Sequence, residues 1–119
     1  MNLPDRLPES LADADLVGVL LPAAVRILSN DFSLSGIDPD LNGFNGDVYA
    51  LRDQLVPVVE QLGGPGSEKF HQLMYRVDIP EKRLNAVIEA TSGIPVTAGI
   101  CELLIIRALQ KAWFRAKYS

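Results

Sequence analysis

Apolar residues recur along this chain at the three- and four-residue spacing of α-helices, in several separate segments. The first segment, residues 11–29, is apolar on nearly every side, which is typical of a helix surrounded by other helices. We therefore expect this helix to lie at the centre of the fold. Pro22 lies within it and predicts a kink or a division near Leu21, because proline lacks the backbone N–H that a helix interior uses.

A stretch rich in Asn, Asp, Ser and Gly follows at residues 30–46. These residue types favour turns, because their side chains bond the local backbone or because Gly accepts a positive φ, so a long loop is predicted here. Asp47 is the predicted N-cap of a second helix over residues 48–62. Pro57 predicts a bend within that helix.

The second half of the chain predicts three more helices. The sequence Gly-Gly-Pro-Gly at residues 63–66 ends the second helix, and Ser67 is placed to cap a third one that runs through Val77. Pro80 suits the first turn of a fourth helix over residues 79–91, because its missing N–H would be unpaired there in any case. The final helix is predicted over residues 94–117 and is the longest.

Alternating patterns typical of β-strands are hard to find in this sequence. The length of 119 residues fits one domain and leaves no room for a second. We therefore predict an all-α fold, a single domain over residues 1–119. It is expected to be a compact bundle of about five helices, with the first helix central and a long C-terminal helix. Residues 1–10 are expected to form a flexible N-terminal segment.

Composition indicates a soluble globular protein, with 48% hydrophobic and 22% charged residues. The longest uncharged stretches, residues 16–25 and 90–101, are well short of the ~20 apolar residues that cross a bilayer, so no membrane span is expected. The first residues carry acids where a secretory signal needs bases. Cys101 is the only cysteine, which excludes an internal disulfide and indicates a cytoplasmic protein.

The charge of the chain is unevenly distributed. Residues 1–60 hold three bases and ten acids, a net charge of −7, whereas residues 61–119 hold eight bases and five acids, a net charge of +3. The overall charge of −4 disfavours nucleic-acid binding by the whole surface. The asymmetry would steer an acidic partner to the second half or let two copies meet head to tail.

His71 is the only histidine, and this scarcity disfavours most enzymes. A catalytic triad, a Cys-His dyad or a three-histidine zinc site each needs a histidine beside a nucleophile or a second ligand. Glu68 and His71 have the spacing used by di-iron helical bundles, but those sites need two such pairs. An ordinary surface histidine is the preferred interpretation, and no cofactor is expected.

Residues 38–43, with the sequence Asp-Pro-Asp-Leu-Asn-Gly, resemble the opening of an EF-hand or dockerin calcium loop. Such loops place oxygen ligands at every second position and then a glycine. The position of the closing glutamate is taken by Tyr49. Asp38, Asp40 and Asn42 are therefore candidate cation ligands, but calcium binding is disfavoured against a solvated turn rich in Asp and Asn.

Basic residues form a ridge on the predicted final helix, at successive four-residue steps. One interpretation is a docking strip for an acidic protein, or for nucleic acid through stacking and phosphate contacts. The preferred interpretation is structural, because the helix dipole favours cations near a C-terminus. Trp113 falls on an apolar face and is expected to pack inward. The candidate partner-binding residues are Arg107, Lys111, Arg115, Lys117 and Tyr118.

Tyr75 and Arg76 lie near Asp78 at the predicted junction of the third and fourth helices. An arginine there would hold a carboxylate and fix the turn, which is the preferred interpretation. The alternative is that Tyr75 and Arg76 bind an anionic ligand in a pocket between helices.

Three short stretches carry a resemblance to known proteins: Leu-Met-Tyr-Arg-Val-Asp at residues 73–78, Leu-Ile-Ile-Arg at residues 104–107, and Gln-Lys-Ala-Trp-Phe-Arg at residues 110–115. In these stretches the chain resembles small all-helical bacterial proteins of unknown function. The resemblance implies an all-α cytoplasmic protein, and it implies no catalytic residue.

The preferred function is a non-enzymatic helical module that associates with another protein, or with a second copy of itself, through the final helix. Abundant apolar helix faces and the scarcity of catalytic motifs favour this interpretation. One alternative is a carboxylate-based enzyme or small-ligand binder with a pocket between helices. Another is nucleic-acid contact through the basic ridge.

Overall fold

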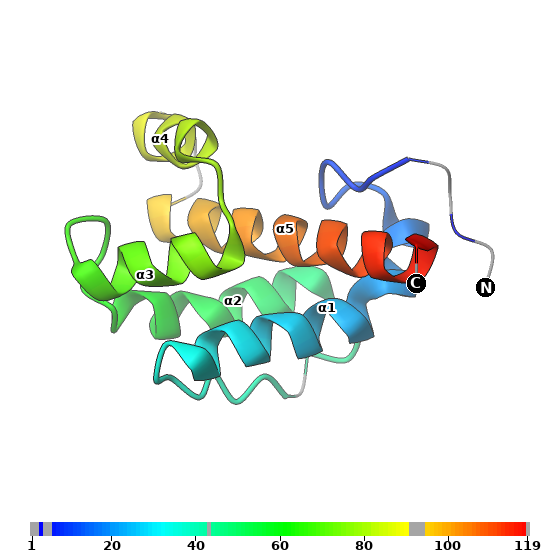
Figure 1. Ribbon diagram of the computed structural model, residues 1–119, viewed down its shortest axis with the longest axis horizontal. Helices are drawn as coiled ribbons and strands as arrows, with labels where there is room; N and C mark the ends of the chain where they lie inside the picture. The colour runs from blue at the N-terminus through cyan, green and yellow to red at the C-terminus, as the bar shows by residue number, and fades with distance from the viewer. Residues whose placement is uncertain (1–2, 4–5, 43, 91–94, 119) are drawn as a thin grey trace.

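The computed structural model describes residues 3, 6–42, 44–90 and 95–118. Within these residues the chain forms five α-helices and no strand, which confirms the predicted all-α bundle (Figure 1). The helices are α1 (Ala14–Leu34), α2 (Val48–Glu60), α3 (Glu68–Val77), α4 (Glu81–Glu89) and α5 (Val96–Tyr118).

The core is organised around the first and last helices. α5 packs against each of the other four helices, and its most extensive contact is with α1. Figure 1 shows α1 running antiparallel to α5, with α1 and α2 on one side of α5 and α4 on the other. The predicted inward position of Trp113 is confirmed, because only 4% of its surface is exposed. The two long helices expected from the sequence therefore form the centre of the bundle.

α1 extends to Leu34, so the prediction of a loop from residue 30 is wrong for its first part. The reason is Phe32, which lies one turn beyond Leu28 and is fully buried with it. Burying a phenylalanine outweighs the modest helix penalty of turn-favouring neighbours, which lie toward the outside of the helix. The connection to α2 begins at Ser35, and Gly36 supports the turn with a φ of 84°.

Pro22 does not divide α1, which is continuous through it. The proline lies on the exposed side of the helix, as does Gly18, whose carbonyl loses its usual donor. α2 is likewise continuous through Pro57. Both prolines are therefore accommodated without a break because their helices have a solvent-facing side.

The predicted helix starts follow local hydrogen bonding. The carboxylate of Asp47 accepts hydrogen bonds from the N–H groups of Tyr49 (2.9 Å) and Ala50 (3.3 Å), which confirms it as the N-cap of α2. Pro80 directly precedes α4, which starts two residues later than predicted and ends at Glu89. The predicted end of this helix at Thr91 and the start of the last helix at Ile94 lie outside the described residues.

The described part of the N-terminal segment packs against the bundle, although the sequence suggested flexibility for residues 1–10. Leu3 and Leu7 are half-buried against the core, and Pro8 is buried. The side-chain amide of Gln110 on α5 donates a hydrogen bond to the Pro8 carbonyl at 3.0 Å. The described residues of this segment are therefore tied to α5 at Gln110.

One described helix, α1, is long and apolar enough to cross a membrane by length and composition. The core helix of a soluble protein satisfies the same criterion, and α1 supplies eight buried residues to this core. The absence of a membrane span stays a prediction from the sequence.

Candidate functional site

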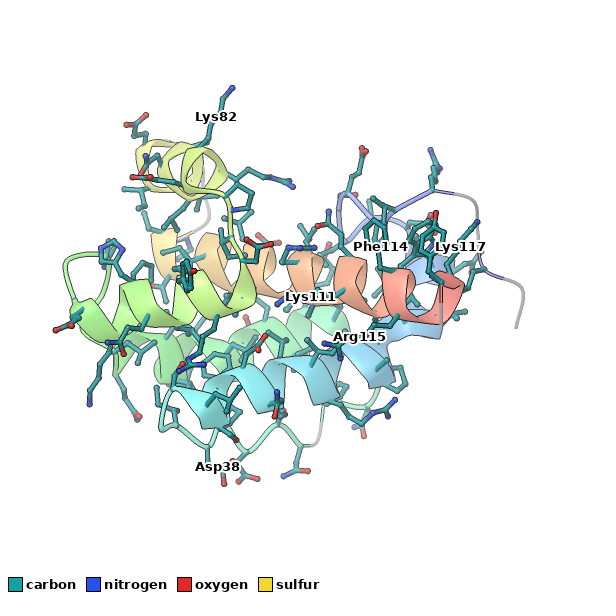
Figure 2. The ribbon with its side chains drawn as sticks, in the orientation of Figure 1. Asp38, Lys82, Lys111, Phe114, Arg115 and Lys117 are labelled. Atoms are coloured by element: carbon teal, nitrogen blue, oxygen red, sulfur yellow. The ribbon has the colours of Figure 1, made fainter. Side chains whose placement is uncertain are left out.

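The basic ridge predicted on α5 is divided by the fold into an inner part and an exposed part (Figure 2). Arg107 and Lys111 are half-buried, whereas Arg115, Lys117 and Tyr118 are exposed. The two parts have different partners.

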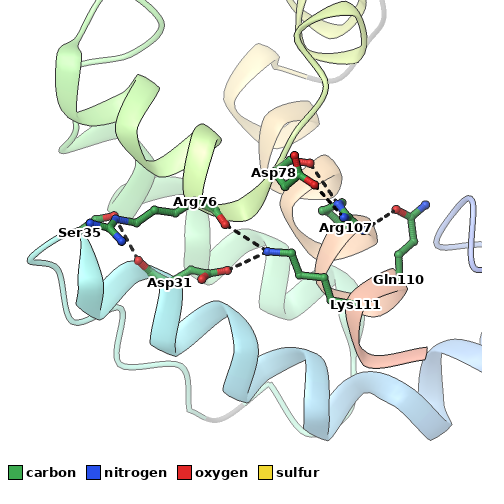
Figure 3. Close-up of polar contacts among 7 residues, drawn as sticks. All are labelled: Asp31, Ser35, Arg76, Asp78, Arg107, Gln110 and Lys111. Atoms are coloured by element: carbon green, nitrogen blue, oxygen red, sulfur yellow. Dashed lines mark hydrogen bonds and ion pairs between the residues drawn. The ribbon is translucent and has the colours of Figure 1, made fainter. Parts of the chain in front are cut away.

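Arg107 fastens α5 to the end of α3. Its guanidinium donates to the carboxylate of Asp78 at 3.0 Å and to the Asp78 carbonyl at 3.1 Å (Figure 3). Asp78 ends α3 in a left-handed conformation with a φ of 67°, which costs energy for a residue other than glycine. The paired hydrogen bonds from Arg107 hold that conformation, so this arginine has a structural role.

Lys111 joins three helices through its ammonium group. The Lys111 Nζ lies 3.4 Å from a carboxylate oxygen of Asp31 on α1 and donates to the Arg76 carbonyl of α3 at 3.2 Å (Figure 3). The side chains of Lys111 and Asp31 are only 18% and 13% exposed. Water screens such a pair little, so Lys111 is part of the scaffold rather than of a docking strip.

The exposed part of the ridge lies at the C-terminal end of α5. Arg115 forms no ion pair with the described residues and lies on the side of α5 that faces α1. Lys117 lies on the other side, as does Phe114, and its Nζ is 5.1 Å from the centre of the Trp113 ring. We call the four exposed side chains Phe114, Arg115, Lys117 and Tyr118 the α5 end.

Aromatic rings make up the rest of this surface. Phe114 is 46% exposed and Tyr118 is 70% exposed, and their ring centres lie 5.6 Å apart at an angle of 31°. Both rings also pack edgewise on the buried Trp113, at 5.4 and 6.0 Å. Phe114 was not among the predicted site residues. Its four-residue spacing to Tyr118 was the signal that would have placed the two rings together.

Arg115 also borders an open groove between α1 and α5. The groove has a volume of about 400 Å³, and its α5 side is formed by Ala112, Arg115 and Ala116. Small alanine side chains leave the groove accessible beside the guanidinium. The α5 end thus combines a cation, a recess and an aromatic pair.

Tyr75 and Arg76 lie on the outer face of α3 and not in a pocket between helices. Tyr75 is 88% exposed, and both residues border a shallow groove together with Glu68 and His71. The contact of Arg76 with Lys111 is made by the Arg76 backbone carbonyl, not by its guanidinium. The carboxylate of Asp78 is held by Arg107 of α5, so the arginine that fixes this turn is not the neighbouring Arg76 that the sequence suggested.

Asp38, Asp40 and Asn42 form a local turn that bonds to itself. The Asp38 carboxylate accepts a hydrogen bond from the N–H of Asp40 at 3.0 Å, and the Asn42 amide donates to the Asp40 carboxylate. The Asn42 carbonyl in turn accepts from the side chain of Gln54 on α2. Gly43 lies outside the described residues. These bonds match the solvated turn that was the preferred interpretation of this motif.

Other chemically reactive groups of the described chain are dispersed. Cys101 is fully buried, and burial raises the pKa of its thiol from 9.0 to about 12, although Arg52 opposes this shift. His71 is exposed and packs edgewise on Phe70 at 5.7 Å. Among the residues that the structure describes, no group of three or more His, Cys, Asp or Glu side chains is arranged to hold a metal ion.

No family model, no curated protein and no solved structure matches this chain. The resemblance noted at residues 73–78, 104–107 and 110–115 stays a prediction. The function must therefore be inferred from the surface of the molecule, and the α5 end is its most distinctive described feature.

Proposed function

We propose that this chain is a helical interaction module that binds an acidic protein segment through the α5 end. The observation that carries the proposal is the exposed pair of Phe114 and Tyr118, whose rings contact one another at the end of the same helix that carries the exposed cations of Arg115 and Lys117. The single thiol supports a cytoplasmic setting for this interaction.

The aromatic pair provides binding energy at low entropic cost. Exposed aromatic rings gain about 25 cal/mol for each Å² of apolar surface that a partner covers. Phe114 and Tyr118 already contact one another and pack edgewise on the buried Trp113, so their side chains lose little freedom on binding. Aromatic residues and arginine are the residue types most enriched at the energetic centres of protein interfaces.

The charge around the rings selects the partner. The last acidic residue of the chain is Glu102, so residues 103–119 carry four bases and no carboxylate side chain. Arg107 and Lys111 are half-buried and pair with Asp78 and Asp31, whereas Arg115 and Lys117 are exposed and add positive charge to this surface. We therefore expect the partner to be an acidic segment with at least one apolar side chain for the rings.

A site-specific crosslink tests this proposal. A photoreactive phenylalanine analogue is placed at Phe114 or at Tyr118 in the full chain, which is expressed and irradiated in cells. The matched control carries the same analogue at Tyr75, which is even more exposed but lies on α3. We expect a protein adduct from positions 114 and 118 that is absent at position 75, and peptide sequencing of the adduct should find an acidic segment.

Two charge reversals complete the test. Arg115→Glu and Lys117→Glu, made in the chain with the analogue at position 114, should abolish the adduct while the far-ultraviolet circular dichroism spectrum stays unchanged. Equal adducts at positions 75 and 114, or none at 114 and 118, would overturn the proposal. An adduct that consists of RNA or DNA would contradict it as well and would favour nucleic-acid contact by the same residues.

A further inference from the structure

Two arginines from different helices border the groove between α1 and α5. Arg26 and Asn30, one helical turn apart, lie on its α1 side, and Arg115 lies on its α5 side. Figure 2 shows Arg115 on the side of α5 that faces α1. All three side chains are exposed, and neither arginine forms an ion pair with the residues that the structure describes. The groove therefore brings two cations together without a described counter-ion.

The acidic residue beside the groove does not supply that counter-ion. Of the described residues that line the groove, Asp31 alone is acidic, and its carboxylate pairs with Lys111 at 3.4 Å. With this pair neutral, the charges of Arg26 and Arg115 give the groove a net charge of +2. Two like charges beside one groove repel each other, so an anion between them is favoured.

The number of charges and donors favours a phosphate monoester over a carboxylate. A carboxylate carries one charge and two oxygens, which a single guanidinium satisfies through two parallel hydrogen bonds. A phosphorylated serine or threonine carries a charge of about −1.5 to −2 and three acceptor oxygens at neutral pH. Two guanidiniums match that charge, and the side-chain amide of Asn30 adds a further donor group. Arginine clusters are a recurring means of recognising phosphorylated segments.

The shape of the groove fits such a side chain. Its volume of about 400 Å³ is at the lower end of the ~300 to 1,000 Å³ of small-ligand sites. Its apolar lining consists of small or buried side chains, which leave room between the two arginines and offer contact to the aliphatic part of a phosphorylated residue. They are Ala23, Ile27, Ala112 and Ala116.

The groove is continuous with the α5 end, because Arg115 belongs to both. Phe114 lies on the other side of α5, and a helix with its side chains is ~10 to 12 Å across. An extended segment advances ~3.3 Å per residue. A segment that contacts Phe114 therefore reaches the groove about three to four residues further along its own chain.

We propose that the groove between α1 and α5 binds a phosphorylated serine or threonine of the acidic segment that the α5 end contacts, with Arg26 and Arg115 as the phosphate ligands. This inference rests on the proposed function and adds a modification that controls the interaction. The phosphorylated residue lies about three to four positions from the apolar side chain that meets the aromatic rings.

Capped amino acids test the groove without the partner. The probes are N-acetyl-phosphoserine amide and N-acetyl-glutamate amide, titrated into the full chain at neutral pH and constant ionic strength while nuclear magnetic resonance follows the arginine Nε–H signals. We expect the signals of Arg26 and Arg115 to shift, and the phosphoserine probe to bind at least about fivefold more tightly than the glutamate probe. Arg26→Gln and Arg115→Gln should each weaken its binding at least about fivefold. The control is Arg83→Gln, which removes an exposed arginine of α4 and should change nothing.

Crosslinking in cells tests the phosphorylated segment itself. In the chain with the photoreactive analogue at position 114, Arg26→Gln should reduce the protein adduct at least about fivefold, whereas Arg83→Gln should leave it unchanged. The adduct peptide should carry a phosphorylated serine or threonine about three to four residues from the crosslinked position. Circular dichroism melts verify that Arg26→Gln stays folded, as expected for an exposed side chain without an ion pair to the described residues.

The outcomes separate this inference from the proposed function. An adduct that forms equally in Arg26→Gln, or one without a phosphorylated residue, would overturn the inference and leave the proposed function intact. No adduct at positions 114 and 118 would overturn both. A phosphoserine probe that binds no more tightly than the glutamate probe would also overturn the inference. Binding of the phosphoserine probe together with an unphosphorylated adduct would overturn it too, and would assign the groove to a free phosphate monoester.

Discussion

Replacing Lys111 by methionine provides the most direct test of the divided ridge. The change keeps the apolar stem of the side chain and removes the ammonium that lies 3.4 Å from the Asp31 carboxylate and 3.2 Å from the Arg76 carbonyl. Asp31 is then left as a carboxylate with 13% exposure and without its cation. Lys111→Met therefore removes two interactions at the point where α1, α3 and α5 meet.

The expected loss of stability follows from burial. Removing one partner of a fully buried ion pair costs about 3 to 5 kcal/mol, and an exposed pair is worth about 0 to 1 kcal/mol. Since both side chains retain some exposure, we expect Lys111→Met to lower the free energy of unfolding by about 2 to 3 kcal/mol. This corresponds to a fall in melting temperature of roughly 8 to 15 °C for a domain of this size.

Urea unfolding followed by circular dichroism and by the fluorescence of Trp113 measures this loss. Arg115→Met is the matched control, because that cation is exposed and forms no ion pair with the described residues, and it should change stability by less than about 0.5 kcal/mol. Adding Asp31→Asn to Lys111→Met should recover at least about 1 kcal/mol, since no buried charge is then left alone. If Lys111→Met costs no more than Arg115→Met, the reasoning is refuted and the ridge is one continuous exposed surface.

Three further predictions concern packing and pH. In Gly99→Ala the new Cβ would lie 2.8 Å from Val87 Cγ1, so we expect the free energy of unfolding in urea to fall by about 1 kcal/mol. In a Val87→Ala background the same change should stabilise the protein, because alanine favours helix over glycine. A loss of stability in that background would contradict the close contact. Phe32→Ala should lower the free energy of unfolding by about 3 to 5 kcal/mol, and Leu34→Ala, at a residue that is 57% exposed, should lower it by less than about 0.5 kcal/mol. Similar losses in the two variants would contradict the observed end of α1. Burial raises the pKa of Cys101 from 9.0 to about 12, so between these values the unfolded chain loses the thiol proton before the native chain does, and stability should fall as pH rises from 9.0 toward 12. Between pH 8 and pH 10.5 the free energy of unfolding should decrease less for Cys101→Ala than for the unchanged chain. An equal decrease in the two proteins would contradict the role of Cys101 in this pH dependence.

The sequence predicts most of this fold because most of its signals are local. Asp47 caps the helix that begins at the next residue, and the glycines at residues 63–66 separate two apolar periodicities. The end of α1 was misplaced because Phe32 is buried by contacts that only the assembled core provides. Local composition around that residue favours a turn, and tertiary packing overrides it.

The candidate site was predictable only in part. The spacing of Arg107, Lys111 and Arg115 places them on one side of a helix, but it does not reveal which of them are used within the fold. Their partners are remote in sequence: Asp78 is 29 positions from Arg107, and Asp31 is 80 positions from Lys111. Pairings over such distances depend on how the helices pack, and spacing along one helix carries no information about them.

The position of α5 among the other helices has a consequence for the order of synthesis. Each earlier helix has contacts with α5, and the most extensive of these joins α5 to α1 across most of the sequence. While the ribosome is still making the preceding helices, their apolar sides lack the surface on which they assemble. Assembly of the complete core therefore needs translation of α5, and until then the apolar sides of the earlier helices that face α5 are exposed to aggregation.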